Sequence, residues 1–294
     1  MLRCWRRSAR RRSGFSRASG LRQPWWRTNS HRQTRFAGLL LVPALALLLL
    51  ISAAQAQQRA LPLDVLRSGI EFSGSDVRGM QSDDLANPGF LWVERGEKSW
   101  NDSKSGASCA SCHGEASGSM RGVAARYPAF DAASGTVLDL EARINDCRVR
   151  RQKQNALARE SDDLLGLTAY VASQSRRLPM ATPIDGPARP AFDRGRAFYN
   201  QRHGQMNLSC AQCHDQNWGK RIYAETLSQG HGNAFPAYKL EWQTVGSLQR
   251  RIRACLFGIR AEMPPAGASE LTDLELFLAW RAQGLPLEAP GVRR

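Results

Sequence analysis

The sequence predicts a mainly α-helical protein built as a tandem duplication of two similar domains. Two short motifs of the form C-x-x-C-H occur in it, at Cys109 to His113 and at Cys210 to His214. Each motif is followed by a related block of 21 residues. Alternating polar and apolar patterns typical of strands are scarce. We therefore expect both halves to share one helical plan.

The repeated block ends at a third cysteine in each half. It runs from Tyr127 to Cys147 and from Phe235 to Cys255, and the two copies align without a gap. Upstream, ERGEKSWND in the first half matches DRGRAFYNQ in the second in pattern. Eight positions of the block are identical: Pro128/Pro236, Ala129/Ala237, Thr136/Thr244, Val137/Val245, Leu140/Leu248, Arg143/Arg251, Ile144/Ile252 and Cys147/Cys255.

Each half is predicted to contain four parts in the same order. A helix precedes the C-x-x-C-H motif, a loop follows it, a short helix ends at the third cysteine, and a longer amphipathic helix closes the half. The first closing helix is expected within 161–177. The second is expected to begin with Ser269 as N-cap and to stop at Gly284.

Between the halves, residues 179–190 contain four prolines, a composition that predicts an extended linker. We place the first domain at 57–180 and the second at 181–294.

Residues 1–56 have the pattern of a cleaved signal peptide. They hold eleven Arg and no acidic residue, and an apolar run at 36–53 precedes Ala54-Gln55-Ala56. Cleavage after Ala56 leaves 30 basic and 26 acidic residues, a net charge of only +4, so no nucleic-acid partner is expected. Export implies an oxidising compartment, the periplasm. An uncleaved membrane anchor is the alternative, but no later stretch is apolar enough for stable membrane insertion.

C-x-x-C-H in an exported protein is the attachment sequence of c-type haem. Two thiols three residues apart lie on one face of a helical turn, where each can form a thioether while the adjacent histidine ligates the iron. The sequence therefore predicts two c-type cytochrome domains with two covalently attached haem c groups. The attachment residues are Cys109, Cys112 and His113 for the first haem, and Cys210, Cys213 and His214 for the second.

Two other chemistries use paired cysteines. A zinc site needs a cluster of four ligands, and only His203 and His231 remain to complete one after the leader is removed. A thioredoxin-like dithiol belongs near a βαβ pattern, which the sequence lacks.

The second axial ligand of each iron determines what the haem can do. Cys147 and Cys255 occupy equivalent positions, one per haem, so we expect a cysteine to ligate each iron opposite its histidine. A disulfide between these two cysteines, or two buried apolar thiols, is the alternative. The other candidate ligands are Met180, Met206, Met263, His203 and His231.

An arginine lies four residues before each third cysteine, on the same helix face. Beside the sulfur, a guanidinium lowers the thiol pKa and offers forked donors to an oxyanion. Around Cys147, Glu141 and Asp146 disfavour an anion. The second half instead adds Arg250, Arg253 and Arg260, of which the first two are expected in a solvated face or against a haem propionate. The predicted catalytic group is Cys255, with Arg251 as the substrate-binding residue.

The residues from Gly230 to Glu262, together with the C-terminal LELFLAWRAQGLPLEAPGVRR, closely resemble the SoxA subunit of the SoxAX c-type cytochrome in its di-haem form. The resemblance implies oxidative coupling of thiosulfate to a cysteine thiol of the carrier SoxYZ, which releases two electrons. It implies that Cys255 is the active-site cysteine, ligates the second haem and can carry a persulfide. It further implies that Arg251 binds substrate and that Cys147 ligates the first haem.

The resemblance also implies the mono-haem cytochrome SoxX as a heterodimer partner and a downstream cytochrome c as electron acceptor. Two other functions fit a chain with two haems. One is a thiosulfate dehydrogenase that joins two thiosulfates to tetrathionate without a carrier protein, and the other is a di-haem electron carrier without a substrate.

Overall fold

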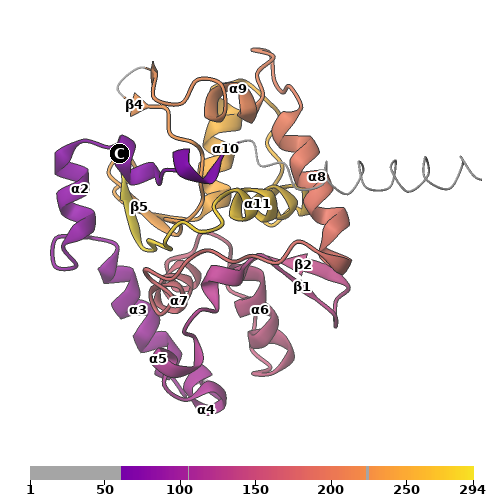
Figure 1. The fold of residues 1–294 in the computed structure, drawn as a ribbon. Helices are drawn as coiled ribbons and strands as arrows, with labels where there is room; N and C mark the ends of the chain where they lie inside the picture. Colours follow the sequence, from indigo (N-terminus) through magenta and orange to yellow (C-terminus); the bar gives the residue numbers. More distant parts are fainter. Residues whose placement is uncertain (1–60, 105, 223–224) are drawn as a thin grey trace, which may run out of the picture. The chain divides into compact units, whose positions relative to one another are not determined.

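The computed structural model describes residues 61–104, 106–222 and 225–294 (Figure 1). The predicted leader and its cleavage site after Ala56 lie outside these residues. Two sets of elements follow the same order along the chain, which confirms a mainly α protein made of two cytochrome-like repeats. The first set comprises α3 (Phe90–Asn101), α4 (Cys109–His113), β1 (Ala129–Asp131), β2 (Thr136–Leu138), α6 (Leu140–Arg150) and α7 (Asp162–Ser173). The second comprises α8 (Arg189–Asn200), α9 (Cys210–His214), β5 (Ala237–Lys239), β6 (Thr244–Gly246), α10 (Leu248–Gly258) and α11 (Ser269–Arg281).

Shorter elements connect these two sets. The 3-10 turns are η1 (Leu63–Val65), η2 (Gly69–Phe72), η3 (Ala124–Arg126) and η4 (Gly186–Ala188). The remaining helices and strands are α2 (Ser75–Ser82), α5 (Ala116–Ser119), β3 (Arg221–Ile222), β4 (Glu225–Thr226) and β7 (Gly291–Arg293). Among the helices in the described part of the chain, none combines the length and the apolar composition needed to cross a membrane.

Two close helix crossings form the frame of the fold. Helix α3 packs on α7 where Gly96 meets Gly166, and α8 packs on α11 where Gly195 meets the backbone of Asp273. A methyl group on Gly96 would come within 2.0 Å of the Gly166 carbonyl oxygen, and one on Gly195 within 1.9 Å of the Asp273 carbonyl oxygen. Only glycine allows this approach, which explains why the matched upstream segments share a glycine at this position.

Each repeated block begins as a small antiparallel hairpin. Strand β1 pairs with β2, and β5 pairs with β6 in the same register. In the second half, the C-terminal strand β7 adds to β5 in parallel, with Lys239 opposite Arg293. The tail thus makes β5 the central strand of a three-stranded sheet and buries its side chains.

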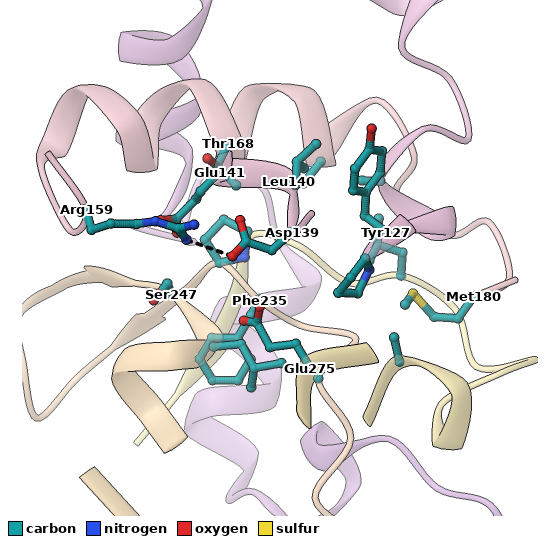
Figure 2. Close-up of a pocket in the computed structure, with 18 residues that line it drawn as sticks. Tyr127, Asp139, Leu140, Glu141, Arg159, Thr168, Met180, Phe235, Ser247 and Glu275 are labelled. Carbon is teal, nitrogen blue, oxygen red and sulfur yellow. Dashed lines mark hydrogen bonds and ion pairs between the residues drawn. The ribbon is translucent and has the colours of Figure 1, made fainter. Parts of the chain in front are cut away.

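A cavity of about 90 Å³ lies where the two halves meet (Figure 2). Equivalent positions of the two repeats line it, and α7 and α11 add Thr168, Ala172, Glu275 and Ala279. The equivalent pairs are Tyr127/Phe235, Pro128/Pro236, Asp139/Ser247 and Leu140/Leu248. The two halves therefore contact each other through equivalent residues and share one interior.

Four boundaries differ from the sequence prediction. Helices α6 and α10 do not end at the third cysteines but continue to Arg150 and Gly258. The helical residues that follow each cysteine include no proline, so each helix continues beyond its cysteine.

Helix α11 has Ala268 as its N-cap, and Ser269 is already helical with its hydroxyl on Glu270 at 3.2 Å. Gly284, at φ +92°, follows the helix end as expected.

The predicted linker is extended only in its first part. There Met180 forms backbone hydrogen bonds with Leu285 and Gly284 of the C-terminal segment. From Gly186 the chain is helical, and Pro190 lies in the first turn of α8. Proline is tolerated there because the first helical N–H groups have no intrahelical partner. The domain boundary between residues 180 and 181 stays a prediction.

Three buried carboxyl groups gather beside this cavity, on Asp139, Glu141 and Glu275. Figure 2 shows Arg159 reaching toward the first two, with Nη1 at 2.9 Å from Asp139 and 3.1 Å from Glu141. The side-chain amide of Gln249 donates to Asp139 at 3.0 Å and to Glu275 at 3.2 Å. Burial raises the pKa of Glu141 to about 8 despite the attraction of Arg159, and it also raises the pKa of Glu275.

A folded-state pKa above the unfolded value makes the protein less stable as pH rises. For Glu141 the stabilisation is fully present below pH 4.5 and is lost as pH rises toward 8. We expect Glu141→Gln to remove this part of the slope, at most about 1.4 kcal/mol per pH unit. Denaturant unfolding of both proteins at pH 5 and pH 8, followed by circular dichroism, measures it. Equal slopes in the two proteins would contradict the assignment.

Candidate functional site

Both C-x-x-C-H motifs form single helical turns started by a serine. The hydroxyl of Ser108 accepts from Ser111 N at 3.0 Å in α4, and that of Ser209 accepts from Gln212 N at 3.3 Å in α9. Because the cap fixes the turn, the two cysteines of each motif lie on one side of it. The two helices lie at opposite ends of the described fold (Figure 1).

All six cysteines of the described residues are free: Cys109, Cys112, Cys147, Cys210, Cys213 and Cys255. The alternative disulfide between Cys147 and Cys255 is therefore absent from this part of the chain. Within the described residues, no group of three or more His, Cys, Asp or Glu side chains is arranged to hold a metal ion, so the zinc alternative finds no ligand cluster. The sheets seen there include no βαβ unit of the thioredoxin kind.

His214 is oriented by the backbone that follows its helix. Its Nδ1 donates to the carbonyl oxygen of Ser228 at 2.8 Å, which leaves Nε2 available as an iron ligand. Gly230 lies directly against the ring, since a methyl there would come within 2.8 Å of the histidine Cγ. A fixed imidazole beside two free thiols fits a covalently attached haem.

Cys255 lies on α10 and faces this histidine. Its thiol interacts with the imidazole of His214, and the residue is accessible to solvent. Protein packed around the sulfur opposes ionisation. The interaction with His214 and the positive charges of Arg251 and Lys239 outweigh that effect and lower the pKa of Cys255. The second site therefore favours a thiolate.

Cys147, at the equivalent position of α6, has the opposite electrostatic environment. Burial raises the pKa of its thiol, and the charge of Asp146 adds to that effect, while Arg143 and Arg150 oppose it without reversing it. The two third cysteines are thus equivalent in position and different in chemistry.

The two equivalent arginines also differ. Arg143 is held by Asp131 at 2.7 Å, by Asp146 at 3.1 Å and by the hydroxyl of Tyr127 at 3.1 Å. Arg251 has one ion pair among the described residues, with Glu225 at 3.5 Å, and is about one-third exposed. Arg143 is therefore a structural cation, whereas Arg251 retains donors for a ligand.

Two of the other basic residues near Cys255 are held by the protein or lie at its surface. The guanidinium of Arg250 stacks over the Trp242 ring at 4.3 Å from its centroid, so it packs rather than faces a ligand. Arg260 is exposed and has a φ of +55°. Arg253 has a buried Nε with no hydrogen-bond partner among the described residues.

The methionine candidates for the second axial ligand are one buried core residue and two surface residues. Met180 is buried in the apolar core between the halves, beside Leu285 and Leu287. Met206 and Met263 are exposed on the surface.

The histidine candidates are engaged elsewhere. His203 Nε2 bonds the Phe198 carbonyl at 2.8 Å, and His231 Nε2 lies 3.2 Å from the side chain of Gln229. Of the seven candidate ligands, Cys255 is the one whose thiol interacts with His214 in the described part of the chain.

One charged residue near Cys255 was missed by the sequence analysis. Lys239, on β5, is almost fully buried and contributes to the low pKa of the thiol. The repeat alignment carries a signal that could have found it, because the equivalent residue is Asp131, so the charge is inverted between the halves.

Comparisons with known proteins agree on one family. The family model described as "SoxA/TsdA, cytochrome c domain" matches residues 95–180 and 194–287. A protein from Pseudaminobacter salicylatoxidans named L-cysteine S-thiosulfotransferase subunit SoxA is 39% identical, over 79% of this chain and 82% of that protein. The protein of the same name from Paracoccus pantotrophus is 36% identical, over 78% of this chain and 80% of its own length.

A solved structure is similar as well. The chain matches one in the crystal structure of SoxXA from P. pantotrophus with a TM-score of 0.75 and 36% identity. The match covers 78% of this chain and 87% of that chain.

The close contact between Gly230 and His214 generates a prediction with a matched control. Gly230→Ala should displace the imidazole and weaken its bond to Ser228, because the methyl meets the ring. Gly122 is the equivalent residue and has a similar φ, +76° against +74°, but a methyl there meets only the end of the Arg126 side chain, at 3.3 Å. Gly122→Ala should therefore show the backbone strain alone, about 1 kcal/mol.

Thermal unfolding and the absorption spectrum of the purified proteins measure both effects. We expect the larger loss of stability, and a changed spectrum, in Gly230→Ala alone. Identical behaviour of the two variants would show that contact with the ring is unimportant.

Proposed function

The chain belongs to the SoxA/TsdA cytochrome c family, and from this membership we propose that it acts as the SoxA subunit of an L-cysteine S-thiosulfotransferase. The reaction joins the terminal sulfur of thiosulfate to the sulfur of a cysteine on a carrier protein. One S–S bond forms and the carrier's S–H bond breaks. One proton and two electrons are released, and the electrons pass to c-type cytochrome.

As a c-type cytochrome the protein binds haem c covalently, and two such groups are supported by its two C-x-x-C-H helices. Bound haem c supplies the one-electron acceptor chemistry that a two-electron coupling requires. The first haem would be held by Cys109, Cys112, His113 and Cys147. The second would be held by Cys210, Cys213, His214 and Cys255.

The observation that carries the active-site assignment is the environment of Cys255. Its thiol faces His214, its pKa is lowered, and Arg251 lies one helical turn away on the same helix. A thiolate is the nucleophilic form of cysteine, and a guanidinium presents forked donors to an oxyanion. Cys255 therefore acts on the sulfur of the substrate, and Arg251 binds its anionic group.

The first site lacks these properties. The Cys147 thiol has a raised pKa, and Arg143 is occupied by Asp131 and Asp146. The role of the first site is to hold haem within the same scaffold.

The partners follow from the same assignment. A mono-haem SoxX subunit would complete a heterodimer, SoxYZ would present the acceptor cysteine, and a downstream cytochrome c would accept the electrons. The location is the periplasm, supported by the arginine-rich leader with its apolar run before Ala54-Gln55-Ala56.

One assay separates this function from its alternatives. The purified protein, with the SoxX partner, is given thiosulfate and cytochrome c, with and without a carrier that has a free cysteine near its terminus. Reduction of cytochrome c only with the carrier supports the thiosulfotransferase. Reduction by thiosulfate alone indicates a dehydrogenase that forms tetrathionate, and no reduction in either case indicates an electron carrier.

The proposed haem content predicts the mass of the mature protein. We expect mass spectrometry under denaturing conditions to give the mass of residues 57–294 plus two haem groups, since thioether bonds survive unfolding. An additional mass of one sulfur would locate a persulfide. A single haem mass would contradict the proposed attachment at both motifs.

Changing each third cysteine to methionine tests which site is catalytic. Cys255→Met should keep both haems and lose thiosulfate-dependent activity by at least about 100-fold, because the reactive sulfur is gone. Cys147→Met, the matched control, should retain most of the activity. The measurement is carrier-dependent cytochrome c reduction at equal haem content, and equal losses would contradict the choice of the second site.

A further inference from the structure

Lys239 is a buried cation that the reaction scheme above does not use. Only 1% of the residue is exposed. Its Nζ lies 3.2 Å from the carboxylate of Glu241 and 3.7 Å from that of Glu225, and 5.2 Å from the centroid of the Trp242 ring. Burying an ammonium group is costly unless it is paired. The burial of the Lys239 ammonium group therefore needs an electrostatic reason.

In the first half, the residues at the equivalent positions hold Arg143 in ion pairs and hydrogen bonds within the protein. There Asp131 occupies the position of Lys239 and binds Arg143 at 2.7 Å. Asp146 and the hydroxyl of Tyr127 complete the set of groups that hold the guanidinium. All three nitrogen atoms of the Arg143 guanidinium donate hydrogen bonds to protein side chains.

All three of these groups are replaced in the second half. Lys239 stands for Asp131, Ala254 for Asp146, and Phe235 for Tyr127. Two carboxylates and one hydroxyl acceptor are thus removed from around Arg251 and one positive charge is added, while Glu225 and Glu241 bring two other carboxylates to the cluster. The scaffold is the same, so the difference lies in the charge that the site presents.

Glu225 joins the two cations of the second half. Its Oε1 lies 3.7 Å from Lys239 Nζ, and its Oε2 lies 3.5 Å from Arg251 Nη2. The lysine and the arginine therefore lie on either side of one carboxylate. Two oxygens of a sulfonate group have nearly the same separation as the two oxygens of a carboxylate, so the same pair of cations can receive a sulfonate.

The two cations of this cluster are matched by two carboxylates, so an anion binds between the cations by displacing the shared carboxylate of Glu225. One carboxylate is shared between two cations, and the second partner of Lys239, Glu241, is 63% exposed and faces solvent. The positive charges of Lys239 and Arg251 both act on the sulfur of Cys255. Arg251 lies one turn before Cys255 on α10 and shares Glu225 with Lys239, so an anion bound between these cations lies near the thiol.

We propose that Lys239 and Arg251 together bind the sulfonate end of thiosulfate beside Cys255, and that Glu225 competes with the substrate for both cations. This inference rests on the proposed function, since it names the group that recognises that substrate. The guanidinium supplies forked donors and the ammonium a point charge. With the sulfonate held in this way, the terminal sulfur is left free for bond formation.

Lys239→Met tests the proposal with the complete enzyme and its partners. Removing one charged contact should raise the KM for thiosulfate roughly 10-fold to 100-fold, a larger effect than the loss of kcat that follows from the weaker lowering of the Cys255 pKa. Lys239→Arg should retain most of the affinity. The matched control is Asp131→Asn at the equivalent position of the first half, which should leave the KM within about twofold of the wild type.

Glu225→Gln is a second, independent test of the proposal, and it keeps Lys239 in place. It removes the competing carboxylate charge, so the KM for thiosulfate should fall several-fold. An unchanged or higher KM in this variant, or an unchanged KM in a Lys239→Met protein with normal haem spectra, overturns the proposal.

Direct binding separates failure of this inference from failure of the proposed function. Equilibrium dialysis with radiolabelled thiosulfate measures affinity without turnover. If the wild type shows no turnover, the proposed function fails, and weaker binding by Lys239→Met than by the wild type still supports the two-cation site. If the wild type turns over and Lys239→Met binds thiosulfate equally well, the inference alone is wrong.

Discussion

The chemistry of this protein depends on the charge around one sulfur atom. Cys255 faces His214, and the positive charges of Arg251 and Lys239 help to lower the pKa of its thiol. The same local fold around Cys147 produces a thiol with a raised pKa, because there the charges are paired within the protein. The difference between the two sulfurs therefore comes from the charged residues placed on a shared helical scaffold.

Duplication explains how such a site is stable. Both halves use a glycine-mediated helix crossing and a serine-capped C-x-x-C-H turn, so the geometry does not depend on the charges near the third cysteine. In the first half, Asp131 and Asp146 bind Arg143 and add stability. In the second half these two carboxylates are replaced, so Arg251 lacks the ion pairs that hold Arg143, as is common where binding and stability compete.

The two halves are also one structure. The cavity between them is lined by equivalent residues, and buried carboxyl groups of both halves share the amide of Gln249. The C-terminal strand β7 covers β5, and so fixes the strand that carries Lys239. The position of the lysine thus depends on residues more than fifty positions later in the chain.

The local features of this protein follow from its sequence alone. The C-x-x-C-H motifs, the repeated block and the helix that carries each third cysteine are short-range patterns, because thioether attachment and helix periodicity involve residues a few positions apart. Only the tertiary structure decided which charges meet. Glu225, Lys239 and Arg251 come from three separate segments, and spacing along the chain does not show that one carboxylate lies between the other two. Helix ends also differed, since α6 and α10 continue past their cysteines while packed against their neighbours.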